Sequence, residues 1–207
     1  MSYFFWCAIA YFVGSLSFAH IVSKLLNLPD PTNYGSGNAG ATNVLRTGNR
    51  KAAYLVLIGD LLKGGGMVVV CRWINQNLDN TNEFVALVSI CVFLGHLYPI
   101  FFNFRGGKGV ATSGGILCVL DPLLGLTAIF VWITVAVVTR YSSLAAIVAG
   151  VITCLIVAIF PTESAVDYSI NFIIFMILIK HRTNIGNLIK GTETKIKLTT
   201  SVNTPRK

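Results

Sequence analysis

The sequence is poor in charged residues, which make up only 12% of its 207 positions. Soluble domains carry about 25% charged residues, so this chain has roughly half the usual share. Apolar side chains account for 54% of the chain, and a soluble fold of this length has too little interior to bury them. The shortage of charge excludes an ordinary soluble domain and indicates a membrane protein.

The sequence also lacks CxxC cysteine pairs and basic residues near its N-terminus. The five cysteines form no CxxC pair and lie in apolar segments, where cysteine acts as a small hydrophobic residue. Their spacing excludes a disulfide framework and a zinc site of the usual pattern. Because no lysine or arginine precedes Lys24, we expect no cleaved signal peptide at this end.

Seven apolar runs predict an all-α, polytopic membrane protein with about seven transmembrane helices, some of them short. The first three are long enough to cross, since about 20 helical residues span the hydrocarbon. The fourth reaches only about 16 Å, the last is similarly short, and Gly64–Gly66 interrupt the second. Five spans remain if the short runs do not cross. The runs are residues 3–26, 52–74, 84–104, 110–120, 123–138, 143–160 and 170–180.

The positive charges predict the orientation. If the runs alternate and the N-terminus lies outside, all of the 16 lysines and arginines except Lys63 and Arg72 fall at inner ends of the runs. Cytosolic segments carry such an excess, so the C-terminus is predicted to be cytosolic. The net charge of +8 then reflects topology, and no nucleic acid partner is expected. We divide the chain into a membrane-embedded domain, 1–191, and a basic cytosolic tail, 192–207.

Four polar clusters fall on the predicted inner face: YGSGNAGATNVLR, FRGGKGVATS, RYSSL and KHRTNIGNLIKGTE. Glycines let a backbone approach a ligand, Ser, Thr and Asn supply neutral donors, and Lys and Arg supply charge. Together the clusters predict a phosphate-binding site at the membrane surface. The candidate residues are Ser36, Gly37, Asn38, Thr42, Asn43, Arg46, Gly106, Gly107, Lys108, Ser142, Ser143, His181 and Asn184.

Two apparent nucleotide motifs in these clusters are incomplete. The GxGxxG pattern that begins at Gly35 follows an apolar span and a proline-containing linker, whereas a dinucleotide site needs a preceding strand. The GGKG sequence lacks the Walker A residues, because Phe102 stands six positions before the lysine and Gly109 follows it. A soluble nucleotide-binding fold is therefore excluded.

Simpler interpretations apply to single residues. Glycine-rich loops are often plain turns, and terminal lysines often extend to lipid head groups. His96 is as plausibly structural as catalytic. Asp60 and Lys63 are three residues apart and can pair on one helix face, which favours a structural role. The same two charges would suit a transporter of a phosphorylated anion, and the basic face alone would suit a scaffold that binds anionic lipid.

The segments GSGNAGATNVLR, GHLYPIFFNFRGGKGVAT and KHRTNIGNLIKGTE resemble, in order and spacing, the motifs of the bacterial acyl-phosphate:glycerol-3-phosphate acyltransferase family. DLLKGG and RYSSL are similar to further family patterns, and the resemblance extends over nearly the whole chain. It implies a seven-span enzyme of the bacterial inner membrane with a cytosol-facing active site.

The implied reaction moves a fatty acyl group from acyl phosphate to the 1-hydroxyl of glycerol 3-phosphate, the first acylation step of phospholipid synthesis. Its products are lysophosphatidic acid and phosphate. The resemblance implies no acyl-CoA, acyl carrier protein, metal or other cofactor. It also implies a functional link to a soluble enzyme that forms acyl phosphate.

By the same resemblance, Ser36 and Arg46 match motif residues linked to activity and phosphate binding. Gly106, Gly107 and Lys108 match a glycine-rich motif associated with glycerol 3-phosphate.

Ser143, beside Ser142, matches the serine of a later loop, and His181 and Asn184 match a polar pair. Glu193 matches an acidic residue whose expected role is structural. His181 is the candidate to deprotonate the glycerol hydroxyl or to orient a phosphate, with a substrate phosphate oxygen as the alternative base.

Two positions depart from the family pattern. Thr32 and Asn187 stand where the family commonly has arginine, so neither is expected to hold phosphate.

Overall fold

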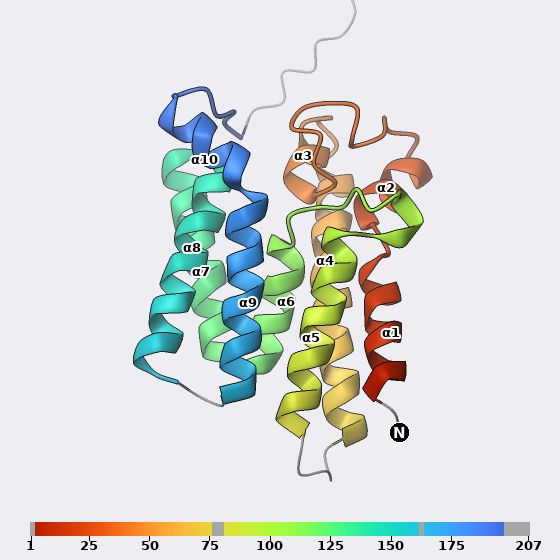
Figure 1. The fold of residues 1–207 in the computed structure, drawn as a ribbon. Helices are drawn as coiled ribbons and strands as arrows, with labels where there is room; N and C mark the ends of the chain where they lie inside the picture. The colour runs from red at the N-terminus through yellow and green to blue at the C-terminus, as the bar shows by residue number, and fades with distance from the viewer. Residues whose placement is uncertain (1–2, 76–80, 162–163, 197–207) are drawn as a thin grey trace, which may run out of the picture.

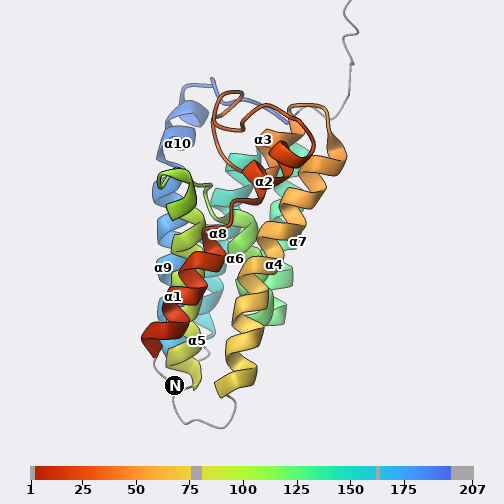
Figure 2. The same ribbon diagram turned by 90° about the vertical axis from the view of Figure 1, so that its right-hand side faces the viewer.

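The computed structural model describes residues 3–75, 81–161 and 164–196, and its regular elements there are all helices. Most of them form an elongated bundle, and α2, α3 and α10 lie at one end of it (Figures 1 and 2). The predicted all-α fold is confirmed for the described residues. The elements are α1 (Tyr3–Gly14), α2 (Phe18–Leu25), α3 (Ala41–Leu45), α4 (Arg50–Asn75), α5 (Thr81–Leu97), η1 (Ile100–Phe102), α6 (Val110–Leu120), α7 (Pro122–Thr139), α8 (Ser142–Ile159), α9 (Ser164–Lys180) and α10 (Arg182–Ile189).

Four helical segments are long and apolar enough to cross a membrane: α4, α5 continued through η1, α7 and α8. Two bent pairs would also qualify, α1 with α2 at 42° and α9 with α10 at 54°. The apolar α6 has only 11 residues. Each predicted run therefore corresponds to a helix or a bent pair, while the number that cross the membrane stays a prediction.

The first run, expected to be one continuous stretch at 3–26, is broken in the structure. α1 ends at Gly14, and α2 turns away after a short break. Gly14 lies so close to α5 that a Cβ would overlap the carbonyl of Val92. Inside the break, the carbonyl of Leu16 accepts a hydrogen bond from Lys63 Nζ of α4 at 2.8 Å. The bend allows α2 to cross the end of the bundle (Figure 2).

The glycines at 64–66 do not interrupt α4, which runs unbroken for 26 residues. Gly64 and Gly65 bring α4 against α6 instead, while Gly66 faces open space. A Cβ on Gly64 would overlap the carbonyl of Thr112, and a Cβ on Gly115 of α6 would overlap the carbonyl of Leu61. The expected interruption is instead a close helix contact. Glycine weakens an isolated helix but also permits near approach of two backbones, and the sequence pattern does not distinguish the two effects.

The last run is longer than the predicted 170–180, because α9 begins at Ser164 and has 17 residues. Asp167, Ser169 and Asn171 make its first half look polar. Ser169 is 1% exposed, and its hydroxyl donates to a backbone carbonyl of its own helix at 2.8 Å. A buried hydroxyl satisfied in this way is compatible with a helix interior.

Basic side chains gather at the end of the bundle that carries α2, α3 and α10. The opposite end has acidic residues where α5, α7 and α9 begin: Glu83, Asp121 and Asp167. This asymmetry is what the predicted orientation requires. The basic residues are Lys24, Arg46, Arg50, Lys51, Arg105, Lys108, Arg140, Lys180, Arg182, Lys190 and Lys195.

Candidate active site

A cavity of about 440 Å³ lies at the basic end, bordered by α4, α6, α7, α8 and α9 and by the polar loops. All four polar clusters contribute to its lining, so residues far apart in the chain meet in one place. The predicted site residues that line it are Ser36, Asn38, Thr42, Asn43, Arg46, Lys108, Ser142, Ser143, His181 and Asn184.

Three predicted site residues, Gly37, Gly106 and Gly107, do not line the cavity. Gly106 and Gly107 pack instead against the end of α5. A Cβ on Gly106 would overlap the carbonyl of His96, and a Cβ on Gly107 would overlap the His96 ring. These two glycines therefore serve close packing beneath Lys108, which their sequence pattern could not distinguish from ligand contact.

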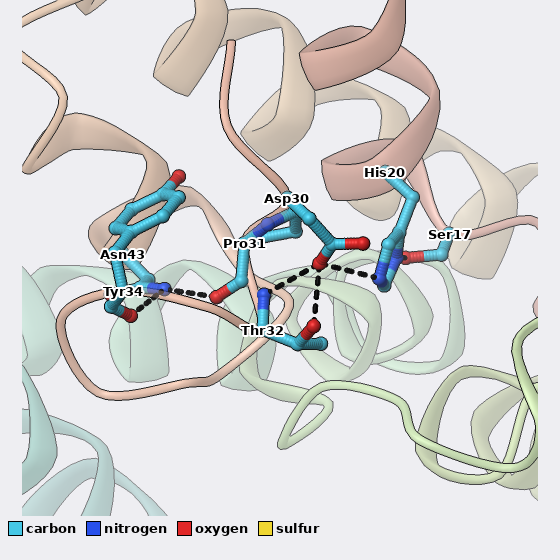
Figure 3. Close-up of polar contacts among 7 residues, drawn as sticks. All are labelled: Ser17, His20, Asp30, Pro31, Thr32, Tyr34 and Asn43. Atoms are coloured by element: carbon cyan, nitrogen blue, oxygen red, sulfur yellow. Dashed lines mark hydrogen bonds and ion pairs between the residues drawn. The ribbon is translucent and has the colours of Figure 1, made fainter.

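The first loop is held in shape by Asn43, which is 2% exposed. Its side-chain oxygen accepts a hydrogen bond from the backbone N–H of Ser36 at 3.0 Å. Its amide donates to the carbonyls of Pro31 at 2.7 Å and Tyr34 at 3.2 Å (Figure 3). Asn43 is thus occupied within the loop, and the exposed Ser36 is the residue that it presents.

A second set of contacts ties the same loop to α2. One oxygen of Asp30 accepts hydrogen bonds from the N–H and hydroxyl of Thr32 at 2.8 and 2.6 Å, and lies 3.7 Å from His20 Nε2 (Figure 3). The two hydrogen bonds from Thr32 hold the pKa of Asp30 below its usual value. Ser17 lies 2.7 Å from the other ring nitrogen of His20. Thr32 is therefore engaged in shaping the loop.

A polar network, which we call the mouth network, joins Glu193, Ser143, Asn184 and Lys108. Glu193 Oε1 accepts hydrogen bonds from the Ser143 hydroxyl and the Asn184 amide, both at 2.7 Å. The Asn184 side-chain oxygen accepts from Lys108 Nζ. Of the two neighbouring serines, Ser143 is the one in this network. Glu193 joins Ser143 and Asn184 in this network, and its expected structural role stays a prediction.

Part of the predicted tail, 192–207, belongs to the site. Thr194 lines the cavity and accepts a hydrogen bond from Arg46 Nη2 at 3.0 Å. The N–H of Ile196 donates to the carbonyl of Arg140 at 2.7 Å. Nothing in this polar segment's composition signals such contacts. The rest of the tail, 197–207, lies outside the described residues.

His181 lies between α9 and α10 and is 3% exposed. Its Nδ1 is 2.8 Å from the carbonyl of Ile177, and because a carbonyl can only accept, Nδ1 carries the proton and Nε2 keeps a lone pair. The pKa of His181 is lowered to about 4, chiefly by burial and also by Lys108, while the Ile177 contact and Glu193 oppose the shift. The imidazole is therefore neutral at neutral pH.

The head of the cavity favours anions. Arg46 and Lys108 contribute positive charge, and α6, α8 and α10 begin at the cavity. The N-terminus of a helix carries partial positive charge and exposed N–H donors. Burial lowers the pKa of Lys108, whereas the nearby Glu193 carboxylate raises it.

Below its polar head, the cavity is lined by apolar side chains of the bundle. They come from α4, α7, α8 and α9, and include Leu57, Ile133, Ala149 and Ile174. A ligand with an anionic head and a hydrocarbon chain matches both parts.

Asp60 and His96 line the cavity although the sequence patterns did not assign them to the site. Asp60 was interpreted as the structural partner of Lys63 or as a charge suited to a transporter, and His96 was left undecided. Their burial, at 2% and 7% exposed, follows from helix packing that a single sequence does not display. Among the described residues, no group of three or more His, Cys, Asp or Glu side chains is placed to hold a metal ion.

The family model described as glycerol-3-phosphate acyltransferase matches residues 4–191. A glycerol-3-phosphate acyltransferase of Nitrosomonas eutropha is 48% identical over 187 residues, which cover 90% of this chain and 94% of that relative. The chain belongs to the glycerol-3-phosphate acyltransferase family. A second relative with that name, from Cupriavidus taiwanensis, is also 48% identical. The matched residues make up 90% of this chain and 93% of that relative.

Two solved structures share the fold of this acyltransferase. The crystal structure of PlsY, an integral membrane glycerol 3-phosphate acyltransferase, in its glycerol 3-phosphate form has a TM-score of 0.88 and 34% identity, covering 95% of this chain and 96% of that one. Its lysophosphatidic acid form has a TM-score of 0.85 and 33% identity, covering 94% and 95%. The chain is an integral membrane acyltransferase of phospholipid synthesis, which excludes the transporter and scaffold alternatives as its main activity.

Proposed function

We propose that this acyltransferase moves a fatty acyl group from acyl phosphate to the 1-hydroxyl of glycerol 3-phosphate, and releases lysophosphatidic acid and phosphate. The observation that carries the proposal is the cavity itself. Its head offers Arg46, Lys108 and helix N-termini to phosphate groups, and its body offers apolar side chains to a hydrocarbon chain. The two similar PlsY structures were solved in a glycerol 3-phosphate form and in a lysophosphatidic acid form.

We also propose that the site faces the cytosol at the bacterial inner membrane. Its end of the bundle carries Lys24, Arg50, Arg105 and Arg182, and positive charge marks the cytosolic side of a membrane protein. A soluble substrate can enter from the cytosol at this end. An acyl phosphate made by a soluble enzyme would be held with its chain among the helices.

The two phosphate groups are assigned to the basic and hydroxyl-bearing side chains at the head. Arg46 and Lys108 neutralise charge, and Ser36 supplies a hydroxyl beside them. Asn38, Thr42 and Ser142 also line the head and add neutral donors. The glycines at 37, 106 and 107 act through the shape of the loops that they allow.

The reaction needs a single displacement. The 1-hydroxyl oxygen of glycerol 3-phosphate attacks the acyl carbonyl carbon, and the bond from that carbon to the phosphate oxygen breaks. The electron pair leaves with phosphate, whose charge Arg46 and Lys108 stabilise. The hydroxyl proton goes to a base. Since an acyl phosphate is already activated, no covalent enzyme intermediate is required, and holding the two substrates together supplies much of the rate.

His181 is the protein's candidate for that base, because its Nε2 keeps a lone pair and the residue lines the cavity. Its pKa of about 4 makes it a weak base in the empty site. Two bound phosphates would raise that pKa, since nearby negative charge favours the protonated ring. A phosphate oxygen of a substrate is the alternative base. If His181→Ala keeps near-normal turnover with acyl phosphate, His181 is not the base and a substrate phosphate oxygen takes the proton.

The proposal is tested with purified protein, acyl phosphate and labelled glycerol 3-phosphate. We expect labelled lysophosphatidic acid and free phosphate in equal amounts. Parallel reactions with acyl-CoA and with acyl carrier protein as donors should give no product. Turnover with either thioester at the same rate would overturn the assignment of the donor, and absence of product from folded protein with every donor would overturn the activity.

A further inference from the structure

Beneath the mouth network lies a second polar group, which we call the floor cluster: Asp60, Lys63, His96 and Thr112. These side chains come from α4, α5 and α6 and are 2%, 6%, 7% and 0% exposed. Charged residues inside membrane helices are costly and mostly serve a function or a pairing. Because Asp60 and His96 also line the cavity, the floor cluster is in a position to influence the reaction.

The floor cluster holds one edge of the His96 ring. Nδ1 of His96 lies 3.4 Å from Asp60 Oδ1 and 3.1 Å from the hydroxyl of Thr112. Lys63 Nζ lies 2.8 Å from the same oxygen of Asp60 and also donates to the carbonyl of Leu16. The ring is therefore fixed from two helices, and Asp60 is itself fixed by a paired lysine.

The opposite edge of the ring supports the glycine-rich loop. Gly107 lies so close to His96 Nε2 that a Cβ would overlap it, and a Cβ on Gly106 would overlap the His96 carbonyl. No side chain fits between the ring and this backbone. Lys108 is the next residue, and its ammonium reaches Asn184 at the cavity.

We propose that His96 is a positioning residue for Lys108. Asp60 and Thr112 fix the ring, and the ring sets where the backbone of 106–108 stands over the cavity. This inference rests on the proposed role of Lys108 as a phosphate ligand. If the loop moves, the ammonium moves with it, and a displacement of about 1 Å at a reacting group can cost on the order of 100-fold in rate.

The test is the variant His96→Asn, alone and combined with Lys108→Ala. Asparagine keeps a donor for Asp60 near the position of Nδ1 but lacks the Nε2 edge that supports Gly107. We expect kcat/KM for glycerol 3-phosphate to fall on the order of 10-fold or more. In the Lys108→Ala background the same change should cost less than about 2-fold, since two residues that act through one contact are not additive.

Two further variants keep the test interpretable. Ser89→Ala is the matched control, because Ser89 is 0% exposed on the same helix but bonds only to the backbone carbonyl of Val85; its rates should equal those of the wild type. Thr112→Val removes one contact to the ring and keeps its shape. It should lower kcat/KM less than His96→Asn does, and it carries the test if His96→Asn does not fold in detergent.

The outcomes separate the two proposals. Wild-type rates for folded His96→Asn, or a loss that multiplies with that of Lys108→Ala, would overturn the positioning role. Where His96→Asn does not fold, wild-type rates for Thr112→Val do the same. If Lys108→Ala alone keeps the wild-type kcat/KM, the role of Lys108 in the proposed function is contradicted instead.

Discussion

The mouth network around Glu193 and the floor cluster around Asp60 face one cavity but are built in different ways. Glu193 binds Ser143, 50 residues away, and Asn184, 9 residues away, at helix ends and loops. Asp60 pairs with Lys63, one turn further along the same helix, and is 2% exposed. Both groups join segments distant in the chain, but the mouth joins mostly half-buried side chains of helix ends and loops, and the floor joins side chains that are at most 7% exposed between packed helices.

This difference predicts how each group responds to change. A partly exposed network can substitute water for a lost partner, so its loss should affect ligand binding more than stability. A buried ion pair has no such replacement, so removing one partner should destabilise the fold.

Removing the charge of Lys108 should have the largest effect on activity. The mouth network contacts this ammonium, and the floor cluster is proposed to position its backbone. In Lys108→Ala, we expect kcat/KM for lysophosphatidic acid formation to fall about 10²- to 10³-fold, because a preorganised positive charge at the phosphates is lost. Lys190→Ala is the control, since Lys190 is exposed at the end of α10 and does not line the cavity. A loss of only a few-fold in Lys108→Ala would assign phosphate binding to other groups.

The stability comparison is made with Asp60→Asn and Glu193→Gln. Asp60→Asn leaves the Lys63 ammonium buried without its carboxylate, so the free energy of unfolding should fall by about 3–5 kcal/mol. Glu193→Gln should change it by less than about 1 kcal/mol. Unfolding of the detergent-solubilised protein, followed by circular dichroism, measures both.

A double variant checks the cause of that loss. Asp60→Leu combined with Lys63→Met removes both charges and should recover much of the stability, because an apolar pair of similar volume can replace a buried ion pair. For the single variants, an equal loss of unfolding free energy in Asp60→Asn and Glu193→Gln would contradict the difference between the floor cluster and the mouth network.

The smallest effect is a pH shift in Glu193→Gln. Glutamine keeps an oxygen that can accept from Ser143 and Asn184 but removes the negative charge. Burial lowers the pKa of Lys108 and Glu193 opposes this, so without the carboxylate that pKa should fall further. Lys108 then loses its proton at lower pH, and the alkaline limb of the kcat/KM profile should move to lower pH.

The control for this shift is Glu83→Gln, at the opposite end of the bundle. It should leave the profile unchanged. An alkaline limb that stays in place in Glu193→Gln would show that Lys108 does not set it, and a limb that moves to higher pH would contradict the sign of the Glu193 effect.

Much of the fold and part of the site could be predicted from local patterns. The apolar runs gave the helices, because an uninterrupted apolar stretch has few alternatives in a membrane. The polar clusters gave Ser36, Arg46, Lys108 and His181, which do line one cavity. The bend after Gly14 was missed because it depends on contact between two helix backbones.

Other parts of the site had no local signal. Thr194 lies in a polar segment that resembles an ordinary tail, and its role arises from a hydrogen bond to Arg46, 148 residues away. Gly106 and Gly107 were assigned to the ligand because a glycine pattern shows where backbones come close but not what they approach. The structure shows that they approach His96.

A helical membrane protein with its polar residues on one face follows from the amino-acid sequence alone. So does the family, since hydropathy and motif order are carried by neighbouring residues. The folded structure was needed to show that Asp60 and His96 reach the cavity, that Asn43 and Thr32 hold a loop, and that Thr194 lines the cavity. These facts depend on which helix faces meet, and that is set by packing between residues distant in the chain.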